Sequence, residues 1–222
     1  MRFLITAGPT REPIDPVRYI SNRSSGKMGY AIAEAALAEA HEIIVISGPV
    51  NLEPPGNAKV ISVSTSDEMF EAVHRYADEC DICVLCAAVA DYKAANVSST
   101  KIKKRGAKFS LGLIPTRDIL DSLGHQHDRQ FVLVGFAAET DHVEENAAKK
   151  LRAKNCDIIV ANDVSSADSG MESDANEVII LFRNGEREKI SRAPKKIIAR
   201  ELVKIFLDFA TKTFDKKNVM IN

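Results

Sequence analysis

Strand-like apolar runs alternate with helical patterns along most of the chain, and this alternation constrains the fold more than any other feature. The runs that predict buried strands are 2–7, 42–47, 58–63, 81–89, 131–135 and 157–161. The patterns that predict helices are 28–40, 66–76, 118–124, 143–154 and 194–214, the second of them capped by Ser66-Asp67. Such alternation is typical of a parallel sheet covered by helices on both faces. The predicted fold class is therefore α/β, a Rossmann-like, doubly wound and mainly parallel sheet.

The alternation is interrupted by a polar stretch at 89–113, which ends in an apparent extra strand at 107–113. We interpret 89–113 as a β-containing excursion from the sheet. Turn residues Asn184-Gly185 predict a hairpin near the C-terminus, and the tail from Asp215 is expected to be frayed. Because no repeat or linker divides the sequence, we expect one domain over 1–222.

The charge balance argues against several function classes. Lysine and arginine number 30 against 31 acidic residues, which gives a formal net charge of -1. No global field therefore favours nucleic acid or an anionic membrane. No apolar run approaches the length that spans a bilayer, and the chain starts directly with a strand pattern. We expect a cytoplasmic protein that binds neither nucleic acid nor membrane.

Three of the four cysteines follow a Cys-x2-Cys-x2-Cys spacing, which could indicate a metal or iron-sulfur site; the four are Cys80, Cys83, Cys86 and Cys156. However, Cys83 and Cys86 lie in an apolar run that predicts a buried strand, where successive side chains point to opposite faces. Reduced core cysteines are the favoured interpretation.

The stretch Ser21–Gly29 lies where a loop passes into an alanine-rich helical pattern. Ser24 or Ser25 can cap that helix, and the glycines let backbone amides approach an anion at the helix start. The spacing matches neither the dinucleotide fingerprint nor the P-loop. The residues alone leave two interpretations open: a phosphate site, or a capped helix start with an incidental Lys27.

Small residues followed by polar ones stand at the ends of four predicted strands: Gly8–Arg11, Ala87–Tyr92, Gly135–Thr140 and Ala161–Ser165. In a parallel sheet these ends share one edge, where ligands bind. Asp91 and Glu139 could hold Mg2+, which takes few carboxylates and completes its shell with water and phosphate oxygens. Solvated loop acids are the alternative.

The basic run Lys101–Arg105 has three interpretations. It could be a solvated charge run or a nucleic-acid patch, although the neutral overall balance and the lack of neighbouring aromatic residues weaken the second. Beside a nucleotide crevice, it could instead be a mobile flap that brings lysine charge onto a triphosphate.

Taken in order, these motifs closely resemble the phosphopantothenate-cysteine ligase family of coenzyme A biosynthesis, also called phosphopantothenoylcysteine synthetases. The resemblance is carried by 5–29, Ala87–Tyr92, Lys101–Lys104, Gly135–Thr140 and Ala161–Ser165. Bacterial members usually form the C-terminal half of a bifunctional protein whose other half is a flavin-dependent decarboxylase. Because this sequence begins at the ligase's first strand, the resemblance implies a stand-alone ligase without flavin.

The resemblance implies a two-step ligation in which 4'-phosphopantothenate attacks the α-phosphate of CTP, with Mg2+, and releases pyrophosphate. The amine of L-cysteine then displaces CMP from the acyl-cytidylate. By match to the family motifs, Asn22 and Lys101 are expected to be catalytic. The expected substrate-binding residues are Arg18, Asn22, Ser24, Ser25 and Gly26. The expected nucleotide-binding residues are Gly8, Ala87, Ala88, Asp91, Lys101, Lys104 and Phe136, with Asp91 also the candidate metal ligand.

One departure concerns the nucleotide. Where bacterial relatives commonly show Asn-Pro-Asp-Ile, this sequence has Pro115–Ile119, so the choice between CTP and ATP as the nucleotide substrate stays open. Family members are dimers, and the excursion at 89–113 could supply the pairing surface of a homodimer. Two alternatives remain: a short-chain NAD(P)-dependent oxidoreductase, whose Tyr-x3-Lys pair is missing here, and a non-enzymatic nucleotide-binding protein.

Overall fold

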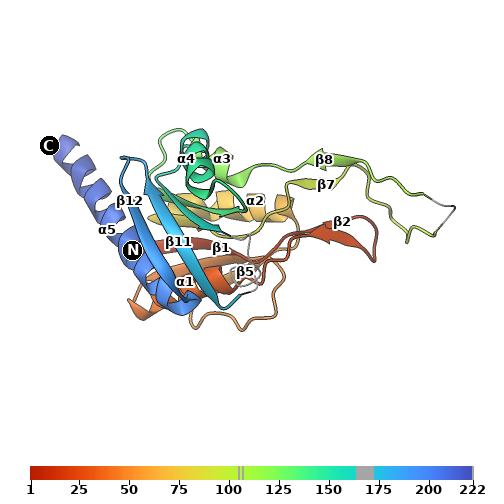
Figure 1. The fold of residues 1–222 in the computed structure, drawn as a ribbon, viewed down its shortest axis with the longest axis horizontal. Coiled ribbons are helices and arrows are strands. Elements are labelled where there is room, and N and C mark those ends of the chain that lie inside the picture. The colour runs from red at the N-terminus through yellow and green to blue at the C-terminus, as the bar shows by residue number, and fades with distance from the viewer. Residues whose placement is uncertain (105, 107, 164–172, 222) are drawn as a thin grey trace.

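The computed structural model describes residues 1–104, 106, 108–163 and 173–221, and its central feature is an eight-stranded sheet (Figure 1). In spatial order the strands are β12 (Arg187–Pro194), β11 (Ala175–Phe182), β10 (Ile158–Asp163), β9 (Val132–Glu139), β6 (Ile82–Leu85), β1 (Arg2–Ala7), β4 (Glu42–Ser47) and β5 (Lys59–Ser62). The six strands from β10 to β5 are parallel, and β11 and β12 add an antiparallel edge. The predicted α/β fold with a mainly parallel sheet is confirmed.

Helices cover both faces of this sheet. On one face lie α1 (Lys27–Ala38) and α5 (Lys195–Ile221); on the other lie α2 (Ser66–Tyr76), α3 (Ile119–Gly124) and α4 (Val143–Ala153). Successive side chains along a strand point to opposite faces of the sheet and so pack in both layers. Phe3 and Ile5 pack toward α1 and α5, whereas Leu4 packs toward the other layer. Apart from the edge strand β5, whose residues are exposed or half-buried, each parallel strand is therefore buried on both faces, which explains its continuous apolar sequence.

The chain direction across the sheet reverses beside β1. From β1 the chain runs outward to β4 and β5, then returns to β6 on the opposite side of β1. Register pairs Phe3 of β1 with Ile43 on one side and Ile82 on the other. The carboxyl ends of β1 and β6 thus form a topological switch point, where open α/β sheets bind ligands.

Two antiparallel strand pairs project from the body side by side (Figure 1). They are β2 (Arg11–Pro13) with β3 (Tyr19–Ser21), and β7 (Tyr92–Ala94) with β8 (Leu113–Pro115). We call residues 11–21 and 92–115 the arm. The predicted excursion is confirmed, but its extra strand was placed too early: β8 begins at Leu113, because the pairing of Tyr92 with Pro115 fixes the register.

Several element ends differ from the prediction. Helix α2 is capped by Thr65 rather than Ser66-Asp67: the Thr65 side chain accepts from the N–H of Glu68, and the Glu68 carboxylate accepts in return from the N–H of Thr65. Helix α5 continues to Ile221, so the tail expected to be frayed from Asp215 is helical instead. The hairpin of β11 and β12 is confirmed, and Gly185 in its turn has φ 90°. Among the described residues, no helix has the length and apolar character needed to cross a bilayer.

Three cysteines lie in the core between the sheet and the α2 layer, namely Cys80, Cys83 and Cys156. Burial raises the pKa of the Cys80 and Cys156 thiols to about 12. These thiols are therefore neutral and pack as small apolar groups.

Candidate active site

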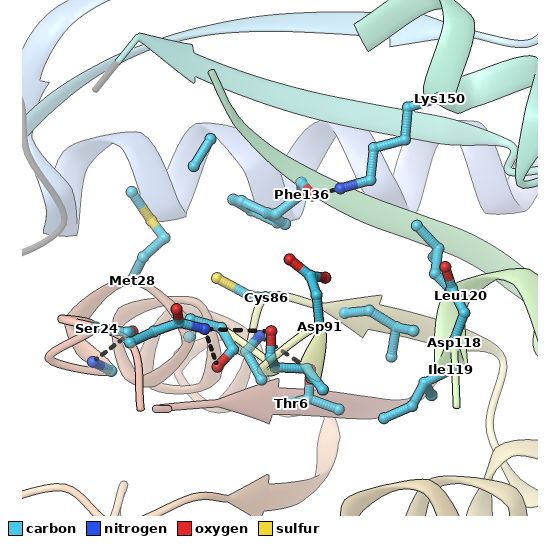
Figure 2. A pocket seen from close by; sticks show the side chains of 18 of the residues that line it. Thr6, Ser24, Met28, Cys86, Asp91, Asp118, Ile119, Leu120, Phe136 and Lys150 are labelled. Carbon is cyan, nitrogen blue, oxygen red and sulfur yellow. Dashed lines mark hydrogen bonds between the residues drawn. The ribbon is translucent and has the colours of Figure 1, made fainter. Parts of the chain in front are cut away.

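A cavity of about 620 Å3 opens at the switch point of the sheet, a size that suits a nucleotide-sized ligand (Figure 2). Its wall comes from the start of α1, the segment after β6, the start of α3, β9, α4 and the start of α5. The predicted site residues that line it are Asn22, Ser24, Gly26, Ala87, Ala88, Asp91 and Phe136. Residues from far apart in the sequence thus converge on one cavity.

Hydrogen bonds join the segment after β6 to the segment after β1. The N–H of Ala87 donates to the Thr6 hydroxyl at 3.1 Å, and the N–H of Ala88 donates to the Gly8 carbonyl at 2.9 Å. Further along, the N–H of Ala90 donates to the Thr10 hydroxyl at 3.0 Å. Gly8 therefore supports the cavity floor from beneath without lining it.

The Asn22 side chain fixes the loop before α1 to the same floor. Its amide nitrogen donates to the carbonyl oxygens of Ala88 at 3.0 Å and of Val89 at 3.2 Å. Both donor hydrogens are thereby used, and no donor to the amide oxygen is found among the described residues. Asn22 therefore lines the cavity and does not cap the helix.

The start of α1 reaches the cavity through glycine. The N-cap is Gly26, with φ 77°, a left-handed conformation that side chains other than glycine rarely adopt. The prediction that Ser24 or Ser25 caps α1 is wrong: the Gly26 cap has no side-chain bond, and the Ser24 hydroxyl accepts from the N–H of Gly26 instead. A side chain at Gly29 would lie 2.7 Å from Cβ of Ala7, so glycine lets α1 pack directly on β1.

The opposite side of the cavity is formed by α3, β9 and α4, with Phe136 and Lys150 above Asp91 in Figure 2. The Lys150 ammonium donates to the carbonyl of Phe136 at 2.9 Å. Lys154 pairs with Asp118 at 2.9 Å. Partial burial of Asp118 acts to raise its pKa, but the N–H of Asp121 and the Lys154 ammonium together lower it.

Basic side chains outnumber acidic ones around the cavity. Among the described lining residues, the bases are Lys27, Arg117, Lys150, Lys154 and Lys195, and the acids are Asp91 and Asp118. The chain as a whole carries a formal charge of -1, so positive charge is concentrated at this site. A polyanion is the ligand class that this concentration favours.

Sequence reasoning singled out neither Lys150, Lys154 nor Lys195, because each lies on a helix whose pattern looked purely structural. Lys150 and Lys154 lie at the C-terminal end of α4 and Lys195 lies at the start of α5, and these positions acquire meaning only once the strand order is known. Asn162 at the end of β10 also lines the cavity. It belongs to a strand-end motif that the sequence did indicate, whereas 164–165 lie outside the described residues.

The remaining predicted site residues lie elsewhere. Ser25 lines a second cavity of about 430 Å3 beside the first. Arg18, Lys101 and Lys104 are exposed on the arm and are not among the residues that line the first cavity; Arg105 of the same basic run lies outside the described residues. Glu139 also lies outside the lining and contacts the side chain of Asn146 at 3.4 Å.

Arg18 is held within the arm by Asp15, whose carboxylate it contacts at 2.5 Å. Arg18 also donates to the carbonyl of Ile102 at 3.0 Å. The Arg18 guanidinium, helped by backbone N–H donors including that of Ile102, holds the pKa of Asp15 well below its usual range. The β2–β3 turn and the start of the basic run therefore form one unit.

Arg117 occupies the stretch where the sequence departs from the family pattern. Its guanidinium stacks over the Phe70 ring at 3.9 Å and pairs with Glu71 at 2.7 Å and with Asp67. Lys93 of the arm also pairs with Asp67. Arg117 thus lines the cavity while its charge is compensated by acids of α2.

Two other lining residues limit the available chemistry. Burial raises the pKa of the Cys86 thiol to about 12, so this thiol is a poor nucleophile at neutral pH. Asp91 is exposed to the cavity, and no cluster of three or more metal-binding side chains is found within the described part of the chain. Asp91 therefore fits a Mg2+ ion only as a single protein ligand beside phosphate oxygens and water.

Comparison with known proteins extends this description. Residues 1–209 match the family model described as "DNA/pantothenate metabolism flavoprotein C-terminal domain". The coenzyme A biosynthesis bifunctional protein CoaBC of Bacillus subtilis is 47% identical over 201 residues, which cover 90% of this chain and 49% of that protein. The chain spans about half the length of the curated relatives it matches.

Solved structures show the same architecture. The crystal structure of the C-terminal domain of a CoaBC protein has a TM-score of 0.80 and 42% identity, and the match covers 96% of each chain. A Cab2 variant in complex with phosphopantothenate-cysteine has a TM-score of 0.76 at 18% identity, covering 96% of this chain and 88% of that one. At that identity the likeness concerns the fold alone.

Proposed function

This chain belongs to the family of the DNA/pantothenate metabolism flavoprotein C-terminal domain, and from this premise we propose that it is a phosphopantothenate-cysteine ligase of coenzyme A biosynthesis. The observation that carries the proposal is the net-positive cavity at the switch point, with Asn22 fixed on its floor. The whole described fold would serve as one ligase domain over 1–222. The residues of the arm would contribute from outside the cavity.

The proposed reaction activates a carboxylate that is otherwise a poor acyl donor. An oxygen of the 4'-phosphopantothenate carboxylate bonds to the α-phosphorus of CTP, and the bond from that phosphorus to the bridging oxygen breaks. Pyrophosphate leaves with the electron pair. The amine of L-cysteine then attacks the acyl carbon of the acyl-cytidylate, CMP departs with the electron pair of the broken carbon–oxygen bond, and the nitrogen loses a proton to water as the amide forms. No oxidation state changes, so the ligation requires no flavin in this chain.

The lining residues suggest how the substrates would be arranged. The nucleotide would lie between Phe136 and the floor at Ala87 and Ala88, whose small side chains leave backbone accessible. The free amide oxygen of Asn22 would face the mixed anhydride or the attacking amine. The Ser24 hydroxyl would donate to phosphate oxygens, and the start of α1, which Gly26 caps, would add backbone N–H donors. Asp91 would approach the ribose or the metal.

A Mg2+ ion would be held mainly by the nucleotide's own phosphate oxygens and water, with Asp91 as the candidate protein ligand. When bound, the ion would neutralise charge on the triphosphate. The lysines of the cavity wall share this electrostatic task. Our proposal therefore needs no dedicated metal cage.

We further propose that two copies pair through the arm. Of the exposed large apolar side chains, those on the arm are Val17, Tyr19, Tyr92, Val97, Phe109, Leu113 and Ile114. Such a concentration is typical of a protein interface. Because Arg18, Lys101 and Lys104 lie outside their own chain's cavity, pairing offers a way for them to act on a neighbouring site, Arg18 on phosphopantothenate and Lys101 on the triphosphate.

A turnover assay tests the ligase proposal. Pyrophosphate release should require a nucleoside triphosphate and 4'-phosphopantothenate together, and amide should form only after L-cysteine is added. Repeating the assay with ATP in place of CTP decides which nucleotide is used. The sequence leaves this choice open because Arg117 lies in Pro115–Ile119, the stretch that differs from the family pattern. Binding of NADPH with no consumption of either triphosphate would overturn the proposal.

A further inference from the structure

Lys195 is a buried lysine at the first position of α5, and it lines the cavity. Only 6% of the residue is exposed. Its backbone N–H donates to the carbonyl of Asp174 at 2.9 Å, which fixes the start of α5. Because lysine is rarely buried to this extent in proteins, its position on a cavity wall calls for a role.

A second lysine faces the cavity from the same end. Lys27 is the first residue of α1, and its ammonium contacts the Asp174 carboxylate at 2.6 Å. That carboxylate is 90% exposed, so water screens its charge strongly. Asp174 therefore links the starts of α1 and α5 while leaving both lysines at the cavity wall.

The electrostatics of Lys195 agree with a site for negative charge. Burial, followed by the positive charge of Lys27, lowers the pKa of the Lys195 ammonium, although Cys86 and Asp174 oppose the shift. An anion between the two lysines would stabilise the charged form of both. The N-terminal end of α1, which Gly26 caps, adds the backbone N–H groups of its first turn at the same place.

Cations also line the other end of the cavity, each in contact with a protein group there. Lys150 donates to the carbonyl of Phe136, Lys154 pairs with Asp118, and Arg117 pairs with Glu71. Figure 2 shows Ser24 and Met28 of the α1 end on one side of the cavity and Asp118, Ile119 and Leu120 on the other. The cavity therefore has a direction, with the start of α3 at one end and the starts of α1 and α5, which carry Lys27 and Lys195, at the other.

We propose that Lys195 and Lys27 form the polyphosphate subsite of the cavity, contacting the β- and γ-phosphates of the nucleoside triphosphate. This inference rests on the proposed function of the same cavity. When the bond between the α-phosphorus and its bridging oxygen breaks, the electron pair stays on the pyrophosphate oxygen, where the two ammonium groups stabilise it. The nucleobase then points toward Phe136 and α3.

Comparing triphosphate with monophosphate binding tests this subsite. Calorimetry should show that Lys195→Met weakens binding of CTP by about tenfold or more, the scale of one lost charge-assisted hydrogen bond, and changes CMP binding by less than about threefold. The matched control is Lys196→Met, one residue later on α5. Lys196 is 77% exposed and pairs with Glu34, so its replacement should leave both affinities unchanged.

A purely structural role for Lys195 predicts a different result, because loss of the α5 start would weaken CTP and CMP alike. Equal losses for the two nucleotides, or none, would therefore overturn the inference. If Lys195→Met does not fold, the affinities for CTP and CMP are compared in the same way for Lys195→Gln and for Lys27→Met, whose lysine is more exposed. Lys195→Arg should restore the wild-type preference for CTP over CMP.

The inference and the proposed function fail separately. If the wild-type chain binds neither CTP nor ATP, the proposed function fails and the subsite falls with it. If the wild type prefers ATP, the titrations use ATP and AMP. If the wild type binds a triphosphate and the lysine variants keep its preference over the monophosphate, only the subsite is wrong.

Discussion

The carboxylate of Asp15 and the guanidinium of Arg18 form a 2.5 Å ion pair that closes the β2–β3 turn. The same pair holds the neighbouring part of the arm. The N–H of Ile102 donates to Asp15 at 3.0 Å, and Arg18 donates to the carbonyl of Ile102 at 3.0 Å. Arg18 and the basic run that begins at Lys101 are therefore positioned together, although Lys101 lies 83 positions after Arg18 in the sequence.

This pair predicts how the arm responds to pH. The Arg18 guanidinium, and after it backbone donors such as the N–H of Ile102, lowers the pKa of Asp15 below its unfolded value of 3.8. The stabilisation that ionised Asp15 gives to the arm is therefore complete above the unfolded pKa and is lost as pH falls through the lower folded pKa. Hydrogen exchange at Ile102, corrected for its intrinsic pH dependence, should show constant protection from pH 7 to about 5 and weaker protection below about 4.

Asp15→Asn supplies the comparison. At pH 7 it should accelerate exchange at Ile102 to near the rate of an unprotected loop, with the rest of the sheet unchanged. Asp128→Asn, at an exposed acid outside the arm, should have no such effect. Equal protection of Ile102 in the wild type and in Asp15→Asn would contradict the proposed coupling.

The apolar surface of the arm leads to a second prediction, on assembly. Phe109→Glu places a charge on a side chain that is 62% exposed in the isolated chain. If two copies pair there, burying that charge should raise the dimer dissociation constant by about 100-fold or more. Analytical ultracentrifugation measures the change.

Ile197→Glu is the matched control for this experiment, because Ile197 is also an exposed apolar residue, at 44%, but lies on α5 away from the arm. It should leave the sedimentation unchanged. A wild-type chain that sediments as a monomer at all concentrations would contradict pairing through the arm.

The parallel sheet was predictable because its inner strands are buried on both faces and each therefore reads as an uninterrupted apolar run. Glu42–Ser47 was predicted to the residue, and the helix ends were located to within two positions, except that α5 runs to Ile221 and not to 214. The ends of the helices were harder to predict, because neighbouring residues compete for the same capping position and their types alone do not decide between them. Thr65, Ser66 and Asp67 are all good caps, and the reciprocal bond with Glu68 decides for Thr65.

The cavity was only partly predictable, for a topological reason. Strand-end motifs such as Ala87–Tyr92 can be identified in the sequence, because small and polar residues follow an apolar run. Lys150 and Lys195 instead belong to ordinary amphipathic helices, and only the position of β9 and β11 in the sheet brings those helices to the cavity. Lys27, which looked incidental in the sequence, has a proposed role because the same topology places it at the cavity.

Close packing of α1 on β1 gives a third prediction. A Cβ at Gly29 would lie 2.7 Å from Cβ of Ala7 and 3.1 Å from the carbonyl oxygen of Thr6, and neither atom can rotate away. Alanine favours a helix over glycine by roughly 1 kcal/mol, but overpacking of a core costs about 1–3 kcal/mol. Gly29→Ala should therefore lower the unfolding free energy and, by shifting the α1 start, weaken nucleotide binding.

Gly112→Ala serves as its control, since a Cβ there would meet its nearest neighbour at 3.8 Å. Urea denaturation should show less than about 0.5 kcal/mol of change for this variant. A Gly29→Ala protein more stable than the wild type would show that the helix propensity outweighs the contact.

A fourth prediction concerns the ion pair of Arg129 and Asp157, whose side chains are only 10% and 14% exposed. Asp157 accepts from Arg129 at 2.9 Å and from the N–H of Leu133 at 2.8 Å, so it ties β9 to the start of β10. Asp157→Ala leaves a largely buried cation without this partner and should lower the unfolding free energy by about 2–4 kcal/mol. Glu201→Ala, which removes the exposed pair with Lys204, should cost less than about 0.5 kcal/mol in the same urea titration. Equal costs for the two variants would contradict this account of burial.

The last prediction isolates Asn22 by an almost isosteric change. In Asn22→Asp the amide that donates to the carbonyl oxygens of Ala88 and Val89 becomes a carboxylate, which repels both. The floor of the cavity should open and the group facing the reacting atoms should change charge. We expect kcat/KM for the ligation to fall by about 100-fold or more, with little change in thermal stability because Asn22 is exposed. Asn51→Asp makes the same chemical change on a loop beside the second cavity and should leave turnover intact. If Asn22→Asp turns over at the wild-type rate, Asn22 does not act on the reacting groups, and its hydrogen bonds to the floor are structural only.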